Sequence, residues 1–157
     1  MPGHIKFQYQ CVHDVVIAYV DWRIETLEDL NVWYGQYQDY FKGRFPHKVD
    51  LILELTKFRL KSSMAARFRE LRNDILDTYT TRSYRVNEPA IERAMMYAGS
   101  ALNGGPANQF ESIATAIEAM LEDRKNGDGA DPGSYSRLAI SETPPALLRR
   151  PSSRPPP

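Results

Sequence analysis

Two adjacent serines among basic residues are the part of this sequence best suited to handling an anion. Ser62 and Ser63 follow the apolar run Leu51-Ile52-Leu53 and stand where a helical pattern begins. Free backbone N–H groups and the positive end of a helix dipole favour an oxygen cap or a phosphate at such a position. The sequence therefore predicts a helix cap, a phosphorylation site, or an anion- or partner-binding surface that includes the nearby cations Lys57, Arg59, Lys61 and Arg67.

Other chemistry-bearing residues do not form a recognisable site. The three histidines show no ligand spacing with one another or with the single cysteine, Cys11. His47 precedes the predicted strand that Ser62 follows, so the two residues should lie at opposite ends and no base would activate the serine. The later NGGPAN stretch lacks the Lys and Ser/Thr of a phosphate-binding loop. We therefore predict no enzyme activity, no metal and no cofactor.

Hydrophobic periodicity predicts the elements at the start of the chain. Alternation from Ile5 to Cys11 predicts a strand, with Cys11 as a small core residue, that forms a hairpin with VVIAYV. Thr26 with Asp29 three residues later resembles a capping box, and the helix that follows should run to Gly43. Within this helix, helical spacing predicts a core face formed by Leu27, Leu30, Tyr34, Tyr37 and Phe41.

The middle of the chain predicts further strands and helices in alternation. KVDLILEL, residues 48–55, is apolar on both faces and predicts a central strand, and AMMYA, residues 94–98, predicts another. Helical spacing indicates helices over 63–79 and after Ser112. Residues 80–93 are interpreted as a polar linker. The predicted fold is α/β: an N-terminal β-hairpin, then alternating helices and strands in a mixed, mostly parallel sheet covered by helices.

The chain is predicted to consist of one domain, residues 1–125, and a disordered tail, residues 126–157. The tail holds seven of the eleven prolines and no sustained periodicity, so it cannot bury enough apolar surface to offset its ordering entropy. Ser152 resembles a basic-directed phosphorylation site in this tail. A short docking motif is predicted from the neighbouring residues Leu147, Leu148, Arg149 and Arg150.

Charge and composition limit the partners and the compartment. Twenty basic residues balance twenty acidic ones, so no overall field favours nucleic acid or an anionic membrane. The single cysteine is consistent with a reducing cytoplasm, and no apolar run is long enough for an integral membrane segment. We expect a cytoplasmic protein with a protein partner. Trp33 and Tyr40 fall on a flank of the first helix and could extend an interface to that partner or to a second copy.

The element order and the serine pair resemble the STAS domain of the anti-sigma factor antagonist class. The resemblance covers about residues 5–124: ILELTKFRLKSSMAA resembles the strand, loop and Ser-bearing helix start, and SALNGGPANQF with ESIATAIEAML resembles the last loop, strand and helix. It implies that Ser62 is phosphorylated by a partner kinase, with Ser63 as neighbour, and that the charge switches protein binding. Lys61 stands where the family commonly has Asp, a reversal of charge that favours a phosphate.

These observations lead to two expected functions. The first is a non-catalytic protein-interaction module in bacterial signalling or assembly, which binds through residues 57–67, with the tail as a further contact. The alternative is a domain that binds a small anionic ligand or a lipid through the same basic loop.

Overall fold

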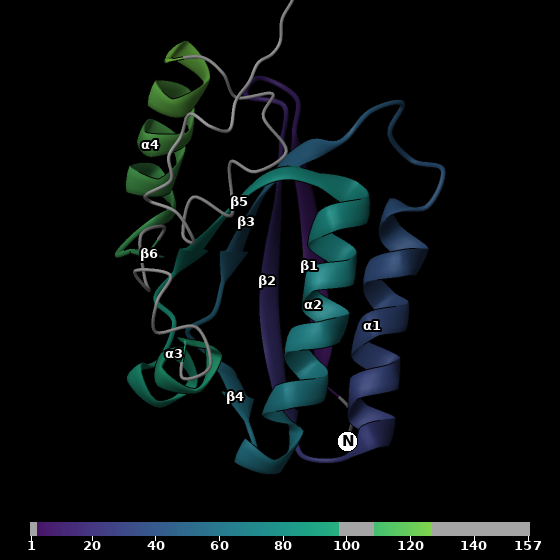
Figure 1. Cartoon of the computed structure of the whole chain (residues 1–157). Coiled ribbons are helices and arrows are strands. Elements are labelled where there is room, and N and C mark those ends of the chain that lie inside the picture. The colour runs from purple at the N-terminus through teal and green to yellow at the C-terminus, as the bar shows by residue number, and fades with distance from the viewer. Residues whose placement is uncertain (1–2, 98–108, 127–157) are drawn as a thin grey trace, which may run out of the picture.

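A six-stranded mixed sheet organises the residues that the structure describes. This structure, a computed structural model, describes residues 3–97 and 109–126. The strands lie in the order β1-β2-β3-β5-β6, and β4 pairs with the far end of β2 (Figure 1). Their bounds are β1 His4–Gln10, β2 Val15–Ile24, β3 Val49–Glu54, β4 Phe58–Leu60, β5 Thr80–Val86 and β6 Gln109–Phe110.

The directions of these strands confirm the predicted α/β fold. β1 and β2 form an antiparallel hairpin, in which His4 is opposite Asp21 and Gln10 is opposite Val15. β2, β3, β5 and β6 run parallel to one another, as does β4 to β2. Crossover helices are needed to connect parallel neighbours, and helices follow β2, β4 and β5 in the chain. The sheet is therefore mostly parallel with one antiparallel edge strand.

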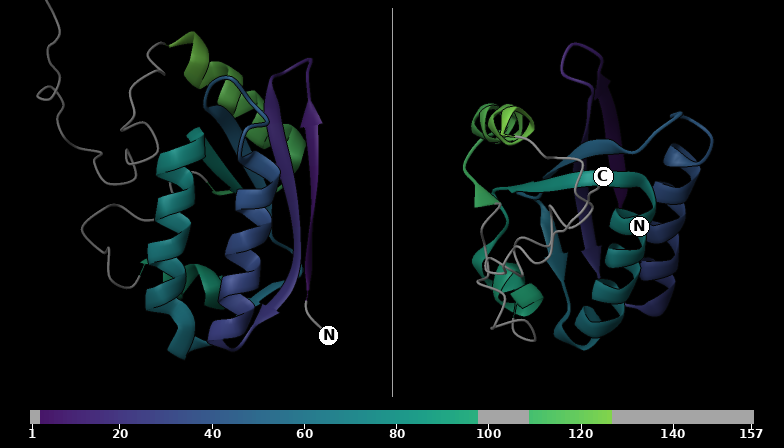
Figure 2. Two further views of the ribbon diagram at one scale, coloured as in Figure 1. Left: turned by 90° about the vertical axis from the view of Figure 1, so that its right-hand side faces the viewer. Right: turned by 45° about the horizontal axis from the view of Figure 1, so that its top comes forward.

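Helices cover both faces of the sheet. α1 Leu27–Phe41 and α2 Ala65–Tyr79 lie side by side on one face, and α4 Ile113–Lys125 lies on the other (Figure 2). The larger core contains Val16, Ala18 and Val20 of β2 beneath α1 and α2, whereas Val15 and Ile17 point to the smaller core beneath α4. This alternation is the period-2 pattern of a strand buried on both faces.

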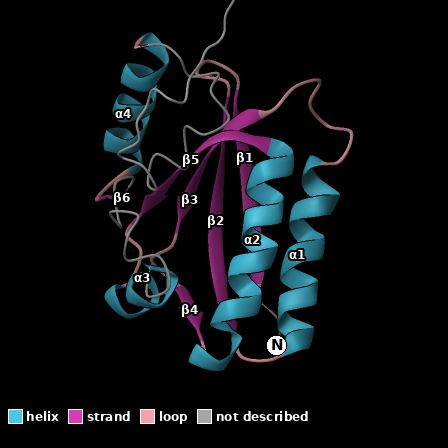
Figure 3. Cartoon of the chain, in the orientation of Figure 1, coloured by secondary structure: helices cyan, strands magenta, loops and turns pink. Residues whose placement is uncertain are grey.

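Two predicted elements after α2 are wrong, and before α2 the predicted basic loop contains the strand β4. Residues 80–86 of the expected linker form β5, a strand in the interior of the sheet, and the expected strand at 94–98 coincides instead with helix α3, Ala90–Tyr97 (Figure 3). β5 was hidden by its two arginines, because Arg82 is buried against Asp50 and thus occupies a sheet position as an ion pair. In α3, the Ala-Met-Met run has strong helix formers and only Met96 of it is fully buried.

The structure confirms the predicted N-terminal cap of α1 but only part of its predicted core face. Thr26 Oγ1 accepts from the Asp29 N–H, and the Asp29 carboxylate accepts from the Thr26 N–H, as in a capping box. Leu27 is exposed, while Trp33, predicted on an interface flank, is buried. Trp33 packs at 4.6 Å, centroid to centroid, on Phe68 of α2, because α2 lies against that flank. Trp33 is therefore a core residue.

Cys11 was also misplaced by the sequence pattern. The strand ends at Gln10, and Cys11 begins the turn to β2, where its side chain is exposed. Asp14, which closes this turn, has a φ of 53°, the left-handed conformation that reverses the chain direction sharply. The alternation of the strand therefore stops one residue before the cysteine.

Candidate functional site

The carboxyl ends of β2, β4 and β5 lie at one edge of the sheet, where α/β proteins commonly bind their ligands. Residues 57–67, here named the carboxyl-edge segment, cross this edge as β4, a 3-10 turn at Ser62–Met64 and the first turn of α2. In Figure 1 it occupies the lower end of the molecule, beside the start of α1. The predicted binding residues are therefore gathered at the edge that the topology favours.

The carboxyl-edge segment is anchored by apolar side chains and presents polar ones. Phe58, Leu60 and Ala65 are buried, and the Phe58 ring lies 5.3 Å from that of Phe68. Between and beside these anchors, every predicted site residue is exposed: Lys57, Arg59, Lys61, Ser62, Ser63 and Arg67. Such alternation holds the backbone in place while Lys57 and Lys61 face solvent. Arg59 is also exposed, and its Nη1 donates to the carbonyls of Thr56 and Phe58.

Two backbone hydrogen bonds fix the same segment to its neighbours. The Leu60 N–H donates to Glu92 Oε2 of α3 at 3.0 Å, and the Lys61 N–H donates to the Ile24 carbonyl at the end of β2 at 2.9 Å. Glu92 is itself buried. A buried carboxylate that accepts from a backbone N–H makes a charge-assisted bond, so α3 holds β4 at its outer edge.

The predicted serine cap is absent. α2 begins at Ala65 with Met64 at its N-cap, the preceding 3-10 turn has Lys61 at its N-cap, and neither makes a side-chain capping bond. The extra turn displaces both serines from the N-cap position. Among the described residues, neither hydroxyl has a hydrogen-bond partner, and the first turns of both helices lack an acidic residue. Ser62 and Ser63 are accordingly exposed hydroxyls in a basic surrounding.

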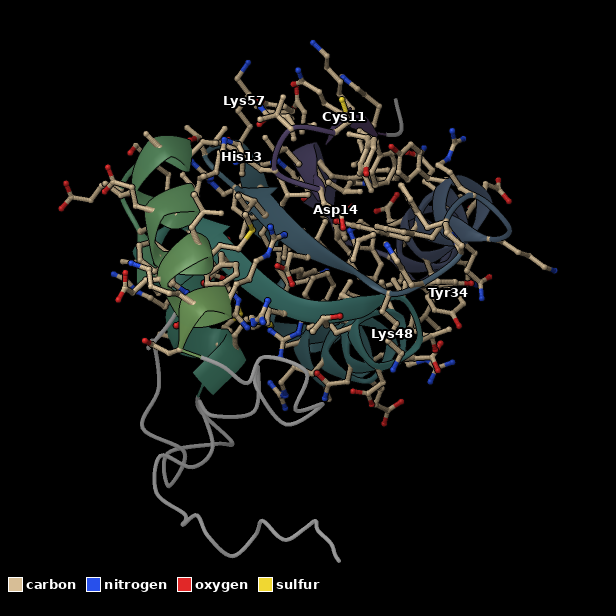
Figure 4. All side chains as sticks on the ribbon, turned by 90° about the horizontal axis from the view of Figure 1, so that it is seen from above. Cys11, His13, Asp14, Tyr34, Lys48 and Lys57 are labelled. Carbon is tan, nitrogen blue, oxygen red and sulfur yellow. The ribbon has the colours of Figure 1, made fainter. Side chains whose placement is uncertain are left out.

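The four cations do not converge on one point. Arg67 donates to Glu70 Oε1 at 2.7 Å, an exposed pair on α2. Lys57 and Arg59 instead line an open groove of about 720 Å³ beside the end of β2. Lys57 points to a different side of the molecule from Lys48, which precedes β3 (Figure 4). The basic residues form a surface rather than an enclosed anion pocket.

A second polar cluster at this edge was not predicted. The Glu54 carboxylate at the end of β3 accepts from the Thr56 backbone N–H and hydroxyl and from Asn87 Nδ2. Gln109 Nε2 donates to buried Glu88 at 2.7 Å. Asn87 has a φ of 56°, which brings β5 to a sharp end. No signal could reveal this cluster once residues 80–93 were interpreted as a linker.

The interior of the domain offers little room for a ligand. A cavity of about 30 Å³ lies between the sheet and the helices α1 and α2, and its lining is mostly apolar. Arg72, Arg85 and Glu88 supply its polar groups. This volume suits one or two water molecules. A bound metabolite would therefore have to lie at the surface.

The opposite edge of the sheet carries a buried ionic network. Asp50 of β3 accepts from Arg82 Nη1 of β5 and from Arg124 Nε of α4, both at 2.9 Å. Arg124 Nη2 also donates to the Asp14 carbonyl. Burial raises the pKa of the Asp50 carboxyl, and both guanidinium groups oppose that rise. The network joins β3, β5, α4 and the hairpin turn, which is a structural role.

The remaining predicted site residues lie elsewhere. His47 is 3.7 Å from the Asp14 carboxylate at the same edge as Asp50, at the end of β3 remote from Ser62, as predicted. Tyr40 is half-buried and stacks on Phe7 of β1 at 4.2 Å, so it belongs to the margin of the core. The predicted tail sites lie outside the described residues: Ser152, Leu147, Leu148, Arg149 and Arg150.

The described ranges, 3–97 and 109–126, contain neither a membrane-spanning helix nor a cluster of metal ligands. No helix within them has the length and apolar character needed to span a bilayer. In the same ranges, no three His, Cys, Asp or Glu side chains gather as metal ligands would.

The chain was also compared with known proteins. No family model, no curated protein and no solved structure matches it.

Proposed function

We propose that this chain is a non-catalytic protein-binding module, and that the carboxyl-edge segment is its contact surface. The observation that carries the proposal is the separation of roles along that segment: Phe58 and Leu60 are buried anchors, while Lys57, Arg59 and Lys61 between and beside them are exposed. A surface held rigidly before binding loses little conformational entropy when a partner docks. The segment therefore suits an acidic protein surface in signalling or assembly, the role that the resemblance to STAS domains also implies.

A protein partner fits this geometry better than a small anion does. A small anion is usually held by convergent donors in a concave site. Here Arg67 is paired with Glu70, and the groove beside Lys57 and Arg59 is open and also contains acidic side chains. Dispersed charges of this kind match an extended partner surface, which can contact each of them separately.

Ser62 gives the proposed surface a means of regulation. Its hydroxyl is exposed and does not cap a helix, so a phosphate could be attached without loss of a structural bond. A phosphate would place about two negative charges beside Lys61. It would thereby neutralise part of the surface that attracts an acidic partner. We expect Ser62→Asp to weaken partner binding more than Ser62→Ala does.

Affinity purification from the native cell tests this proposal. The full-length chain, a Lys57→Glu/Arg59→Glu variant and a Lys48→Glu control would be compared by quantitative mass spectrometry. Lys48 is exposed and lies at the other edge of the sheet. We expect the double variant to lose partners that the control retains. Equal recovery by all three would contradict the proposal.

Two additional experiments distinguish the proposed function from the competing ones. Deletion of residues 126–157 would abolish recovery if the tail, rather than the domain, made the main contact. A thermal-shift series with inorganic phosphate, citrate and anionic lipid micelles would raise the melting temperature if the surface bound a small anion or lipid, since a ligand stabilises by mass action. A shift that disappears in Lys61→Ala would favour that alternative.

A further inference from the structure

β1 is an edge strand, and no other strand in the described part of the chain lies along its outer side. It stands at one end of the strand order, and its seven residues pair with β2 in unbroken antiparallel register (Figure 2). The unpaired main-chain groups of an edge strand can bind a further strand. The outer side of β1 is therefore a second place where another chain can dock.

A hydrogen bond from α1 identifies the residues of β1 whose main-chain groups face outward. The Ile5 N–H donates to Oε1 of Gln36 at 3.1 Å, so it points away from β2. Alternate residues of a strand direct their backbone groups to the same side, so the N–H and C=O groups of Phe7 and Tyr9 also point away from β2. Within the described residues, no hydrogen bond uses these groups of Phe7 and Tyr9. An added strand can pair with them.

β1 lacks the features that usually keep a free strand from pairing. Those features are a proline, a bulge, a covering segment or a lysine that points along the edge. β1 contains no proline, and its register with β2 has no shift. Its one lysine, Lys6, is opposite Tyr19 of β2 and holds its ammonium 5.8 Å from the centre of that ring. This lysine is therefore turned toward the sheet rather than across the free edge.

Aromatic side chains flank the free edge on the face that α1 covers. The Tyr40 ring of α1 stacks on the Phe7 ring at 4.2 Å, centroid to centroid, and Tyr40 is only half-buried. The Tyr9 residue is 41% exposed. In an added strand, the residues opposite Phe7 and Tyr9 would point to this same face. Apolar side chains at those positions would cover the exposed parts of the rings.

The other face of the edge is open to solvent and carries a positive charge. Lys6 and Gln8 are exposed there, and β1 contains no acidic residue. Asp21 of β2 is also on this face, but it is opposite His4 and lies one strand further from the free edge. A lysine ammonium sits on a flexible stem, so Lys6 can turn from Tyr19 toward a carboxylate of an added strand.

A narrow extended segment fits this edge better than a second copy of the domain. Antiparallel pairing of two β1 strands would place both α1 helices on the same face of one continuous sheet. Neighbouring strands lie about 4.8 Å apart, whereas packed helices need about 8 to 10 Å. Because Tyr40 of α1 packs on Phe7 of β1, the two helices would compete for the same space where they meet.

We propose that the outer side of β1 binds an extended segment of a protein partner as an added strand, in which apolar and acidic residues alternate. The apolar residues are opposite Phe7 and Tyr9, and an acidic residue is opposite Lys6. This inference goes beyond the proposed function and does not depend on it, because the two surfaces are separate. β1 pairs with residues 15–21 of β2, whereas β4 pairs with residues 22–24.

Amide hydrogen exchange of the full chain, measured by NMR, tests whether this edge is free and is used. Without a ligand, the amides of Phe7 and Tyr9 should exchange fast, while those of Lys6 and Gln8, which face β2, should be protected. The peptide Thr-Val-Glu-Val-Glu-Val-Thr should slow exchange at Phe7 and Tyr9 at least about tenfold at saturation. Protection of both amides without peptide, or no change when it is added, would overturn the inference.

The acidic positions are tested by exchange of charge. A second peptide has Lys in place of both Glu residues. We expect the parent chain to bind the glutamate peptide at least about fivefold more tightly, the size of one opposite-charge contact across strands. Lys6→Glu should reverse this preference, and the control Lys48→Glu should keep it. An unchanged preference in Lys6→Glu would refute the acidic positions.

Main-chain pairing is tested by removing donors on each side. A glutamate peptide with methylated amides at alternate positions keeps every side chain, and in one of the two possible phases it should lose binding. Proline is tolerated in an edge strand where the N–H points to solvent, so Tyr9→Pro should fold and bind less tightly than Tyr9→Ala. Circular dichroism checks the fold of both variants. Unchanged binding of the peptide in both methylation phases would reject strand addition.

The variant Lys57→Glu/Arg59→Glu separates this inference from the proposed function. Pairing with Phe7 and Tyr9 uses neither cation, so the double variant should bind the glutamate peptide as the parent chain does. Loss of peptide binding in this variant would place the peptide on the carboxyl-edge segment. That outcome would refute docking at β1 and leave the proposed function standing.

Discussion

The two ends of the parallel sheet use charged residues in opposite ways. At the amino end, Asp50 is 3% exposed and is clamped by Arg82 and Arg124. At the carboxyl end, Lys57, Arg59 and Lys61 are exposed, and the buried groups between them are apolar. The Asp50 network is therefore internal to the fold, whereas the cations of residues 57–61 lie on the surface above the buried carboxylates Glu88 and Glu92.

This difference shows how to separate structural from functional charges in this molecule. Removing one member of a buried ion pair leaves an uncompensated charge, which destabilises a protein strongly. An exposed charge contributes little to stability, and the exposed cations stand at the edge where α/β sheets commonly bind ligands. Stability and binding should accordingly respond to mutations at different ends of the sheet.

The largest effect on stability is expected from Asp50→Ala at the amino edge. Because the variant leaves two guanidinium groups without their carboxylate, we expect the free energy of unfolding to fall by about 3 to 5 kcal/mol. Urea unfolding, monitored by circular dichroism, measures this free energy of unfolding. The control Asp39→Ala removes an exposed carboxylate of α1 and should change stability by no more than about 0.5 kcal/mol. Similar losses in the two variants would show that the Asp50 network is not structural.

A smaller loss is expected from Glu92→Ala, which tests how the carboxyl-edge segment is held. The buried Leu60 N–H would lose its acceptor, and an unsatisfied buried donor costs about 1 to 3 kcal/mol. Glu92→Gln keeps an acceptor oxygen and should retain most of the stability. Hydrogen exchange at Leu60 provides the local measurement. Equal protection of this amide in both variants would mean that α3 does not anchor β4.

Two serine substitutions compare how much a serine at the start of α4 and one before α2 contribute to stability. Ser112 caps α4 by accepting from the Thr115 N–H at 3.1 Å, whereas Ser62 makes no cap. We expect Ser112→Ala to lower the free energy of unfolding by about 1 kcal/mol. Ser62→Ala should stay within about 0.5 kcal/mol of the parent chain. Equal costs in thermal or urea unfolding would restore the structural interpretation of Ser62.

The sequence predicted the fold where apolar periodicity was strong. The hairpin, the capped helix after Thr26 and the central strand around Ile52 all follow from local pattern and are confirmed. β5 was missed because Arg82 and Arg85 resemble surface residues, although both are buried. The compensating Asp50 stands 32 residues before Arg82, and no local pattern reveals such a pairing.

For the candidate site, too, local sequence pattern predicts exposure but not contacts between distant segments. The exposure of Lys57, Arg59 and Lys61 could be predicted from their alternation with Phe58 and Leu60. The groove beside them could not, because it depends on where β1 stops relative to β2 and on which turn of α1 lies alongside. The prediction that Trp33 lies at an interface was wrong for a related reason. Periodicity shows which residues share a face of one helix, but it does not show which flank a second helix covers.

We propose that the carboxyl-edge charges serve binding and not stability. This claim is tested most directly by measuring both properties on one variant, Lys57→Glu/Arg59→Glu, with Lys48→Glu as control. We expect both variants to unfold within about 0.5 kcal/mol of the parent chain, since all three side chains are exposed. Only the double variant should lose its partner in affinity purification. A double variant that binds normally, or one whose loss of binding is matched by loss of the fold, would contradict the account.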